Sequence, residues 1–359
     1  MTARTSISYV PGNRRYSRRI RQAAIISTTL AVVLLFVMIV SLVKANQLMR
    51  QPAKPLDTFS SNILPSFNLA SFPSLDEQTT LHGWFFWPDQ DPVSTIILVH
   101  NQGDNRLQFG LDSAGFYQFL LDQGFCVLAF DLRNSGQSGG EMSGFGYAEA
   151  ADVLAAIRYV RKNATTRDVL LFGFGTGVSA SLMALDQLPP AGTAAAVLAE
   201  DDEAAAEAAA LLKKYPKDIR KLGFDQSYVQ GLLLDTPCDT PDEYIRAVCR
   251  ADGWFGEYLL QSTVPYAIRL STGSTSRPNL VTILTRSQLP VFLTYSESAA
   301  AVSQSSIETL VAERTRLHPD TTSTFASSQP GFADGYVKDQ TAYQTAVKAF
   351  LSRYFANPA

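Results

Sequence analysis

The chain has 359 residues, of which 46% are hydrophobic and 18% are charged, and its formal net charge is −3. This length suits one large domain or two ordinary ones. A nearly neutral chain lacks the basic face that phosphate binding requires, so its composition argues against a nucleic-acid partner. The three cysteines show no metal-ligand spacing, although Cys238 and Cys249 could pair in an oxidising compartment.

The first feature along the chain is an uncharged run of 21 residues, Ala23 to Val43. It is long enough to span about 30 Å, the hydrocarbon thickness of a bilayer. The apolar core of a cleaved signal peptide is shorter, about 7–15 residues. We therefore predict a transmembrane helix over 23–43 with the lipid bilayer as its partner, and Val43-Lys44-Ala45 leaves cleavage as the alternative.

The charges that flank this run predict its orientation. Six arginines precede it, and only Lys44, Arg50 and Lys54 follow at similar range. By the positive-inside rule, residues 1–22 form a cytoplasmic basic tail and the rest of the chain lies outside the cytoplasm. The expected location is therefore the membrane, with a single span.

Residues 44–73 are rich in Ser, Pro and Asn and are predicted to form a linker. From 74 to 359, apolar runs of strand length alternate with stretches of helical periodicity. The predicted strands are 81–87, 95–100, 125–130, 169–172, 229–234, 290–295 and 322–327. The predicted helices are 116–123, 147–162, 176–187 and 341–355. This alternation predicts an α/β domain with a mostly parallel, doubly wound sheet covered on both faces.

Two segments interrupt the alternation. Residues 189–226 contain an Ala/Glu-rich stretch with high helix propensity, and they are longer than a helix-to-strand connection needs, so they form an insertion. This insertion is either a solvated helix packed on the sheet or a partner-binding surface. Residues 241–285 are predicted to form a helical lid over the carboxyl edge of the sheet, where ligands bind in such folds.

A strand-to-helix turn in the middle of the chain carries the most informative motif. Residues 169–177 read VLLFGFGTG, which is the outline of a G-x-S-x-G nucleophile elbow with Gly175 at the position of the hydroxyl nucleophile. The elbow holds its central residue in a strained backbone conformation. Because glycine adopts that conformation at no steric cost, the turn can persist while the chemistry is lost.

Several further motifs stand in register with this elbow. Residues 81–85 are typical of an opening hairpin, 98–106 contain a variant of a His-Gly-x-Gly loop with Asn101 in place of the first glycine, 130–140 are close to D-x-R-G-x-G-x-S-x-G, and 233–237 are close to D-S-P. Together they resemble the α/β-hydrolases, specifically the membrane-anchored bacterial serine hydrolases. The resemblance covers about residues 72–355. It implies an α/β-hydrolase fold after one N-terminal transmembrane helix, with an oxyanion loop and pocket that include His100, Asn101, Gln102, Gly103 and Thr176.

The resemblance also implies a catalytic triad in the chain order Ser, Asp or Glu, His. The three corresponding positions are degenerate: Gly175 stands for the nucleophile, Ser298 (or its neighbour Ala299) for the acid, and Phe332 for the histidine. Thr176 and Asp235 are the fallback candidates for a relocated nucleophile and acid.

The supporting groups offer no obvious replacement. Glu297 is a poor substitute for the acid by position. The three histidines, His82, His100 and His318, are not placed to act as the base.

These losses predict a catalytically inactive protein that acts in binding or scaffolding, with a protein partner or a small apolar ligand. The alternative is an active esterase or acyl hydrolase with relocated catalytic groups. No cofactor is predicted, because Gly173-x-Gly175 has the spacing of a dinucleotide fingerprint but Val178 replaces its third glycine. No metal site is predicted.

Overall fold

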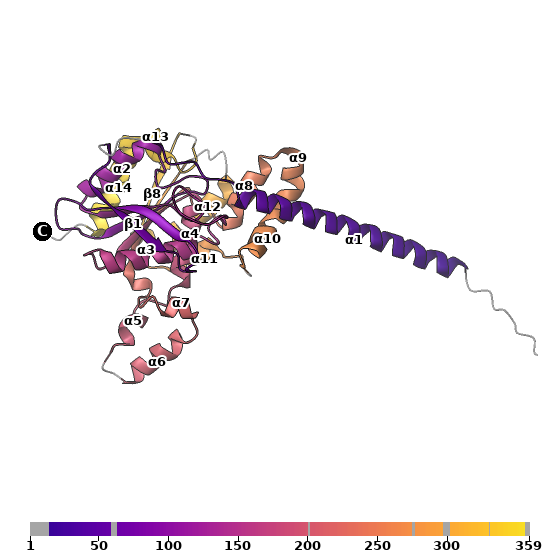
Figure 1. Cartoon of the computed structure of the whole chain (residues 1–359), viewed down its shortest axis with the longest axis horizontal. Coiled ribbons are helices and arrows are strands. Elements are labelled where there is room, and N and C mark those ends of the chain that lie inside the picture. The colour runs from indigo at the N-terminus through magenta and orange to yellow at the C-terminus, as the bar shows by residue number, and fades with distance from the viewer. Residues whose placement is uncertain are drawn as a thin grey trace, which may run out of the picture.

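The structure is a computed structural model that describes residues 14–58, 63–199, 202–274, 277–296, 302–329 and 331–355. A long helix, α1 (Arg14–Met49), projects from a globular α/β domain (Figure 1). Its segment from Arg18 to Met49 is long and apolar enough to cross a membrane.

The domain is built on one sheet of eight strands in the order β1-β2-β4-β3-β5-β6-β7-β8. β1 pairs antiparallel with β2, β2 pairs antiparallel with β4, and the other neighbours are parallel. The strands are β1 (Phe67–Pro73), β2 (Thr80–Phe86), β3 (Thr95–Val99), β4 (Cys126–Phe130), β5 (Val169–Phe174), β6 (Val229–Asp235), β7 (Val291–Ser296) and β8 (Thr322–Ser327). The predicted mostly parallel sheet is confirmed.

Helices cover both faces of this sheet. The helices that follow α1 are α2 (Ser113–Asp122), α3 (Ala150–Asn163), α4 (Thr176–Gln187), α5 (Thr193–Ala196), α6 (Asp202–Leu212), α7 (Lys217–Arg220), α8 (Pro241–Arg250), α9 (Gly253–Phe255), the π-helical turn η4 (Gly256–Leu260), α10 (Gln261–Ser271), α11 (Leu280–Arg286), α12 (Gln304–Leu317), α13 (Gly335–Lys338) and α14 (Gln340–Phe355). Single turns of 3₁₀ helix are η2 (Gly110–Asp112), η3 (Gln226–Tyr228) and η5 (Pro319–Thr321).

The central strands are apolar throughout because both of their faces are buried. In β3, Ile97 and Val99 belong to the core beneath α3 and α4, whereas Ile96 and Leu98 belong to the core beneath α2 and α14. Successive side chains of a strand point to opposite faces, so a single run of apolar residues supplies two cores.

The predicted linker 44–73 is shorter in the structure. Residues 44–49 continue α1, and residues 67–73 form the edge strand β1. The buried residues Ala45, Leu48 and Met49 belong to the core of the domain. The long helix α1 therefore enters the domain directly, and only the segment between α1 and β1 connects elements.

The predicted insertion and lid are both helical. The insertion contains α5, α6 and α7 and hangs away from the sheet (Figure 1). The predicted lid contains α8 to α11: α10 packs beside the domain-proximal end of α1, whereas α11 packs against α4 and α12 (Figure 1). The side chain of Ser41 in α1 donates a hydrogen bond to Thr263 in α10 over 2.7 Å.

Candidate functional site

The elbow between β5 and α4 keeps the backbone of a nucleophile elbow. Gly175 separates the last residue of the strand from the first residue of the helix, with φ 52° and ψ −118°. Its N–H donates to the backbone oxygen of Asp235 in the neighbouring strand over 3.0 Å. A positive φ favours glycine, which has no Cβ to collide with the backbone. The turn therefore has the expected shape without a side chain at its tip.

The space above Gly175, which a nucleophile would occupy, is filled. A Cβ atom on Gly175 would lie 2.4 Å from Oδ1 of Asn101 and 3.0 Å from Cζ of Phe332. The first distance is shorter than a carbon–oxygen contact permits, so any side chain at this position would displace Asn101. Asn101 and Phe332, which belong to two distant parts of the sequence, together close the tip of the elbow.

The donors of the oxyanion loop are also occupied. In this fold the oxyanion hole consists of the N–H after the nucleophile and an N–H from the loop after the third strand. Here the N–H of Thr176 donates to Oδ1 of Asn101 over 3.1 Å. The N–H of Gln102 donates to Oγ1 of Thr176 over 2.7 Å, and the N–H of Asn101 donates to Oε1 of Gln108 over 2.8 Å. An amide oxygen of the protein thus sits where a substrate carbonyl would bind.

Further contacts hold Asn101 in this position. Its Nδ2 donates to the backbone oxygen of Gln102 over 2.9 Å and to Oδ2 of Asp104 over 3.2 Å. Residues 51–57, which we call the linker strap, lie against the same loop. The N–H of Lys54 donates to the oxygen of Gly103 over 2.9 Å, and its Nζ pairs with Asp104 over 2.6 Å. The linker strap, which follows α1, thereby holds this loop in place.

The three histidines take no part in the elbow. His100 is buried, its Nδ1 lies 2.8 Å from the oxygen of Asn101, and its Nε2 accepts from the N–H of Leu132 over 2.9 Å. These contacts fix a neutral ring with the proton on Nδ1, and burial lowers the pKa of His100. His318 contacts the oxygen of Thr285 behind the sheet, and His82 lies within β2.

At the expected position of the catalytic histidine, Phe332 packs with its ring 6.1 Å from that of Tyr244 in α8. The next residue, Ala333, has a positive φ of 53° and donates its N–H to Oγ1 of Thr236 over 2.9 Å. The loop that would present a histidine therefore presents an apolar ring instead.

The structure describes one of the two candidate acid positions, Asp235, and not the other. Ser298, together with Glu297 and Ala299, lies outside the described residues. Asp235 is buried, accepting from the hydroxyl of Tyr343 over 2.9 Å and from that of Thr236 over 3.0 Å. Both hydrogen bonds favour the ionised carboxylate, but the loss of hydration outweighs them and raises the pKa of Asp235 to about 7.

The fallback nucleophile Thr176 is buried and already engaged. Its Oγ1 accepts from Gln102 and donates to Oδ1 of Asn101 over 3.3 Å. Hydroxyl activation requires an adjacent base, commonly a histidine. The acceptor that Thr176 has is a neutral amide oxygen, which cannot take up its proton.

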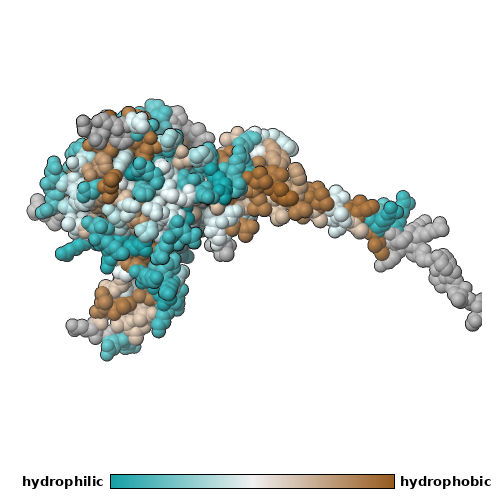
Figure 2. Space-filling model, viewed as in Figure 1, coloured by the Kyte–Doolittle hydropathy of each residue, from teal (hydrophilic) through white to brown (hydrophobic). Residues whose placement is uncertain are grey.

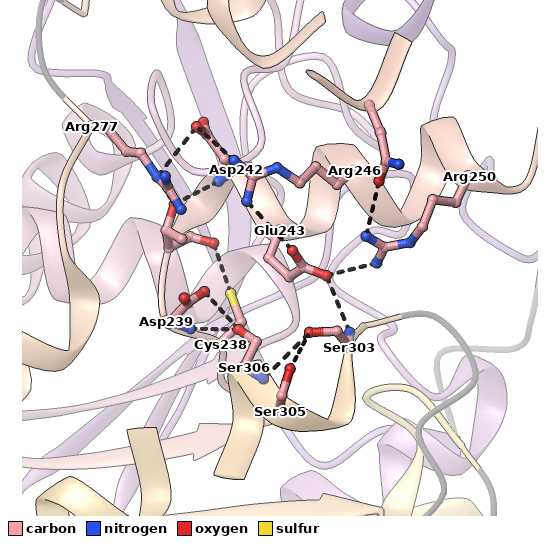
Figure 3. Close-up of polar contacts among 12 residues, drawn as sticks. Cys238, Asp239, Asp242, Glu243, Arg246, Arg250, Arg277, Ser303, Ser305 and Ser306 are labelled. Carbon is pink, nitrogen blue, oxygen red and sulfur yellow. Dashed lines mark hydrogen bonds and ion pairs between the residues drawn. The ribbon is translucent and has the colours of Figure 1, made fainter. Parts of the chain in front are cut away.

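The predicted lid segment is fastened at α8 by charged side chains (Figure 3). Asp242 in α8 accepts from the hydroxyl of Tyr147 over 2.7 Å and pairs with Arg269 of α10 over 2.5 Å. Glu243 pairs with Arg250 over 2.6 Å and accepts from the N–H of Ser303 over 3.2 Å. Buried carboxylates need such partners, so the network holds α8 against the body of the domain.

The cavity beside the elbow is small. It has a volume of about 10 Å³ and is lined by residues that include His100, Gln108 and Phe174. This is room for about one water molecule. Larger cavities, of about 360 to 520 Å³, lie in other parts of the domain. Within the residues that the structure describes, no group of three or more His, Cys, Asp or Glu side chains could hold a metal ion. All three cysteines are buried free thiols.

Part of this site was visible in the sequence and part was not. The replacement of a loop glycine by Asn101 is a sequence signal, but its consequence depends on where the side chain points. The linker strap gave no signal, because its contacts with residues 103–105 join segments about 50 positions apart.

Comparison with solved structures places the fold among esterases and related hydrolases. An esterase of Pyrococcus furiosus superposes with a TM-score of 0.59 at 16% identity, covering 86% of this chain and 99% of that one. The α/β hydrolase GrgF from Penicillium sp. sh18 gives 0.51 at 15% identity, covering 81% and 100%. Est1E from Butyrivibrio proteoclasticus, solved with ferulic acid, gives 0.54 at 13% identity, covering 80% and 100%.

In sequence, no curated protein matches the chain. The profile of the alpha/beta hydrolase family, in contrast, matches residues 96–330. This match spans more than half of the chain and includes the loop after β3, the elbow and the lid. Together with the topology of the sheet, it shows that the chain belongs to the alpha/beta hydrolase family.

Proposed function

We propose that this chain is a membrane-anchored member of the alpha/beta hydrolase family that has lost hydrolysis and acts in binding or scaffolding. One observation carries the proposal: Oδ1 of Asn101 accepts from the N–H of Thr176 directly above Gly175. A single side chain thus fills both the place of the nucleophile and the oxyanion hole.

The magnitudes of the family's catalytic effects support this reading. Removing triad members leaves a residual acceleration of about 10³–10⁴-fold, which comes from the oxyanion hole and binding. Loss of one oxyanion donor typically lowers kcat by about 10²–10³-fold. Here Gly175 supplies no nucleophile and Asn101 occupies the donor, so the residual acceleration falls to about 1–10²-fold.

The anchor is the second part of the proposal. The charges before and after residues 23–43 favour a cytoplasmic N-terminus and an extracytoplasmic domain. The helical insertion, which hangs away from the sheet, favours a protein partner, and the apolar ring of Phe332 beside Gly175 favours a small apolar ligand.

Covalent labelling tests the loss of hydrolysis. The purified full-length chain, in detergent, is treated with a fluorophosphonate probe and assayed on short acyl esters, amides and thioesters. We expect no labelling and no turnover above the heat-denatured control. Labelling at any Ser or Thr, or ester turnover that copurifies with the chain, would overturn the proposal.

A matched pair of variants separates the filled hole from the missing side chains. Gly175→Ser with Phe332→His restores a nucleophile and a base but should stay unlabelled, because Asn101 still blocks the new hydroxyl. The combination Gly175→Ser, Phe332→His and Asn101→Gly restores a nucleophile, a base and an open oxyanion hole, and should be labelled more strongly. Equal labelling of both variants would show that Asn101 does not block the site.

One observation favours a second candidate function, an esterase with relocated groups. The pKa of about 7 gives Asp235 the basicity of a useful general base near neutral pH. Thr176 would be the nucleophile, and its hydroxyl would have to leave Asn101 to reach Asp235, whose carboxylate contacts Tyr343 and Thr236 in the structure. This alternative requires turnover that disappears in both Thr176→Ala and Asp235→Asn, and the absence of turnover in the parent chain rejects it.

A further inference from the structure

We propose that the segment from α9 to α10 is a membrane-seated face, which holds exposed aromatic side chains in the headgroup region of the bilayer that α1 crosses. This inference rests on the anchoring part of the proposed function and adds a second contact with the lipid. The occupant is the interfacial layer of the bilayer, whose chemistry combines hydrocarbon with polar groups.

The helix α1 is joined firmly to the segment from α9 to α10. Its last turns carry a buried stripe at helical spacing, formed by Ser41, Ala45 and Leu48, while Leu42 and Val43 on the other side are exposed. Ser41 donates to Thr263 of α10 over 2.7 Å, and Lys44 pairs with Asp252, just before α9, over 2.5 Å. The helix and the lid therefore keep one mutual orientation, so the same face of the domain always meets the membrane.

The pairing of Lys44 with Asp252 sets the depth of this segment relative to the hydrocarbon layer. The uncharged run ends at Val43, so Lys44 marks the boundary of the hydrocarbon layer. Asp252 lies at the level of Lys44 because the two are paired. Ser41 is three residues earlier, about 4.5 Å deeper at 1.5 Å per residue, and Thr263 lies beside it. The segment from Asp252 to Thr263 thus spans the boundary itself.

The exposed surface of this segment is rich in aromatic side chains. We call the following side chains the aromatic patch: Trp254 (73% exposed), Tyr258 (66%), Tyr266 (68%) and Leu270 (74%). Trp and Tyr are enriched at membrane interfaces, where an apolar ring and one polar group match the layer. Trp84 is buried and Trp87 is 37% exposed, so the most exposed of the three tryptophans, Trp254, lies on this patch.

The members of the patch face the same way as the contact with α1. Tyr266 and Leu270 follow Thr263 by three and seven residues, a spacing that places all three on one side of a helix. The rings of Trp254 and Tyr258 lie 5.7 Å apart. Figure 2 shows the apolar surface of α1 running up to the base of the domain, where α9 and α10 lie in Figure 1. Through the contacts of Thr263 and Asp252 with α1, the patch lies next to that apolar surface.

Charged side chains contribute little to the proposed contact with the membrane. The neighbouring Asp252 and Glu257 are acidic, and Lys44 and Arg250 are basic, so the face has both signs. The contact should therefore depend on apolar burial and remain in high salt, unlike a polybasic attachment to anionic lipid.

Quenching by brominated lipid tests the proposal on the full chain. The protein is reconstituted into phosphatidylcholine vesicles with or without bromine on the acyl chains near the headgroup, and tryptophan emission is compared. We expect bromine to remove up to about a third of the emission, because one of the three tryptophans reaches the interface. Trp254→Phe should abolish the difference, and the matched control Trp87→Phe should retain it. The difference should persist in 1 M salt.

A second pair of variants tests the membrane contact and keeps Trp254 as the fluorescent reporter. Leu270→Asp should reduce quenching of Trp254, because a carboxylate in the interface disfavours insertion. Leu198→Asp, at a position on the insertion that is 84% exposed, should leave quenching unchanged.

Flotation of the same vesicles, with an alkaline carbonate wash, separates the two proposals. Protein that stays with the vesicles but is not quenched through Trp254 overturns the membrane seat and leaves the anchor intact. Protein that does not float overturns the anchor and the seat together. Absent quenching with a crosslinked dimer would assign the patch to a second copy of the chain and would also overturn the seat.

Discussion

The closure of the elbow by Asn101 makes a quantitative prediction for Gly175→Ala. The new Cβ must adopt φ 52° and would lie 2.4 Å from Oδ1 of Asn101. Holding a residue with a Cβ in this backbone region costs about 1–3 kcal/mol. Displacing Asn101 leaves the N–H of Thr176 without its acceptor, which costs about a further 1–3 kcal/mol. We expect the free energy of unfolding to fall by about 2–6 kcal/mol in total.

A double-mutant cycle separates the two contributions. In an Asn101→Gly background the colliding oxygen is absent, so Gly175→Ala should cost only the backbone strain and the tight contact with the ring of Phe332. The coupling energy between the two positions should therefore be about 1–3 kcal/mol. The assay is urea unfolding of the full chain in detergent, followed by far-ultraviolet circular dichroism and tryptophan emission.

Gly192→Ala is the matched control for strain alone. Gly192 also has a positive φ, of 86°, but a Cβ there would meet no atom within 4 Å. Its substitution should cost about 1–2 kcal/mol. If Gly175→Ala costs no more than Gly192→Ala, or if its effect simply adds to that of Asn101→Gly, then Asn101 does not fill the elbow and the reasoning is refuted.

Three further predictions concern the rest of the domain. Arg106→Met leaves the fully buried Asp131 without its ion pair and should lower the free energy of unfolding by about 3–5 kcal/mol, whereas Arg50→Ala, in an exposed pair, should change it by at most about 1 kcal/mol in the same urea titration. Burial raises the pKa of Asp235 to about 7, so the folded chain holds this proton more tightly than the unfolded chain and stability should fall as the pH rises from about 4 to 7. Asp235→Asn should flatten that part of the measured pH–stability curve, and an unchanged curve would contradict the assignment. Burial raises the pKa of all three cysteine thiols, so a thiol reagent at about pH 8 should leave the native protein unmodified and react after unfolding; fast labelling of the native chain would contradict their burial.

The sequence predicted the elements of the fold well, because their signals are local. The helix after the elbow and the last strand have the predicted bounds, 176–187 and 322–327. Apolar runs of strand length, separated by helical periodicity, depend only on neighbouring residues. The linker was predicted less well. Residues 67–73 form β1 because they pair with residues 80–86. Their own composition does not predict a strand.

The candidate site divides in the same way. The absent side chain at Gly175 and the replacement of the loop glycine by Asn101 are facts of the sequence. That Oδ1 of Asn101 accepts from the N–H of Thr176, 75 positions away, depends on the adjacency of β3 and β5 in the sheet. The same holds for Phe332, whose ring reaches Gly175 only after the chain returns from β8.

The sequence by itself determined the long apolar helix near the N-terminus, the α/β class and the glycine at the nucleophile position, since each follows from residue type and local spacing. Only the tertiary structure decided that the elbow is closed, that the linker strap holds the oxyanion loop, and that α10 is joined to α1. Those three features are contacts between segments far apart in the chain. Their energies depend on distances and burial that no local pattern encodes.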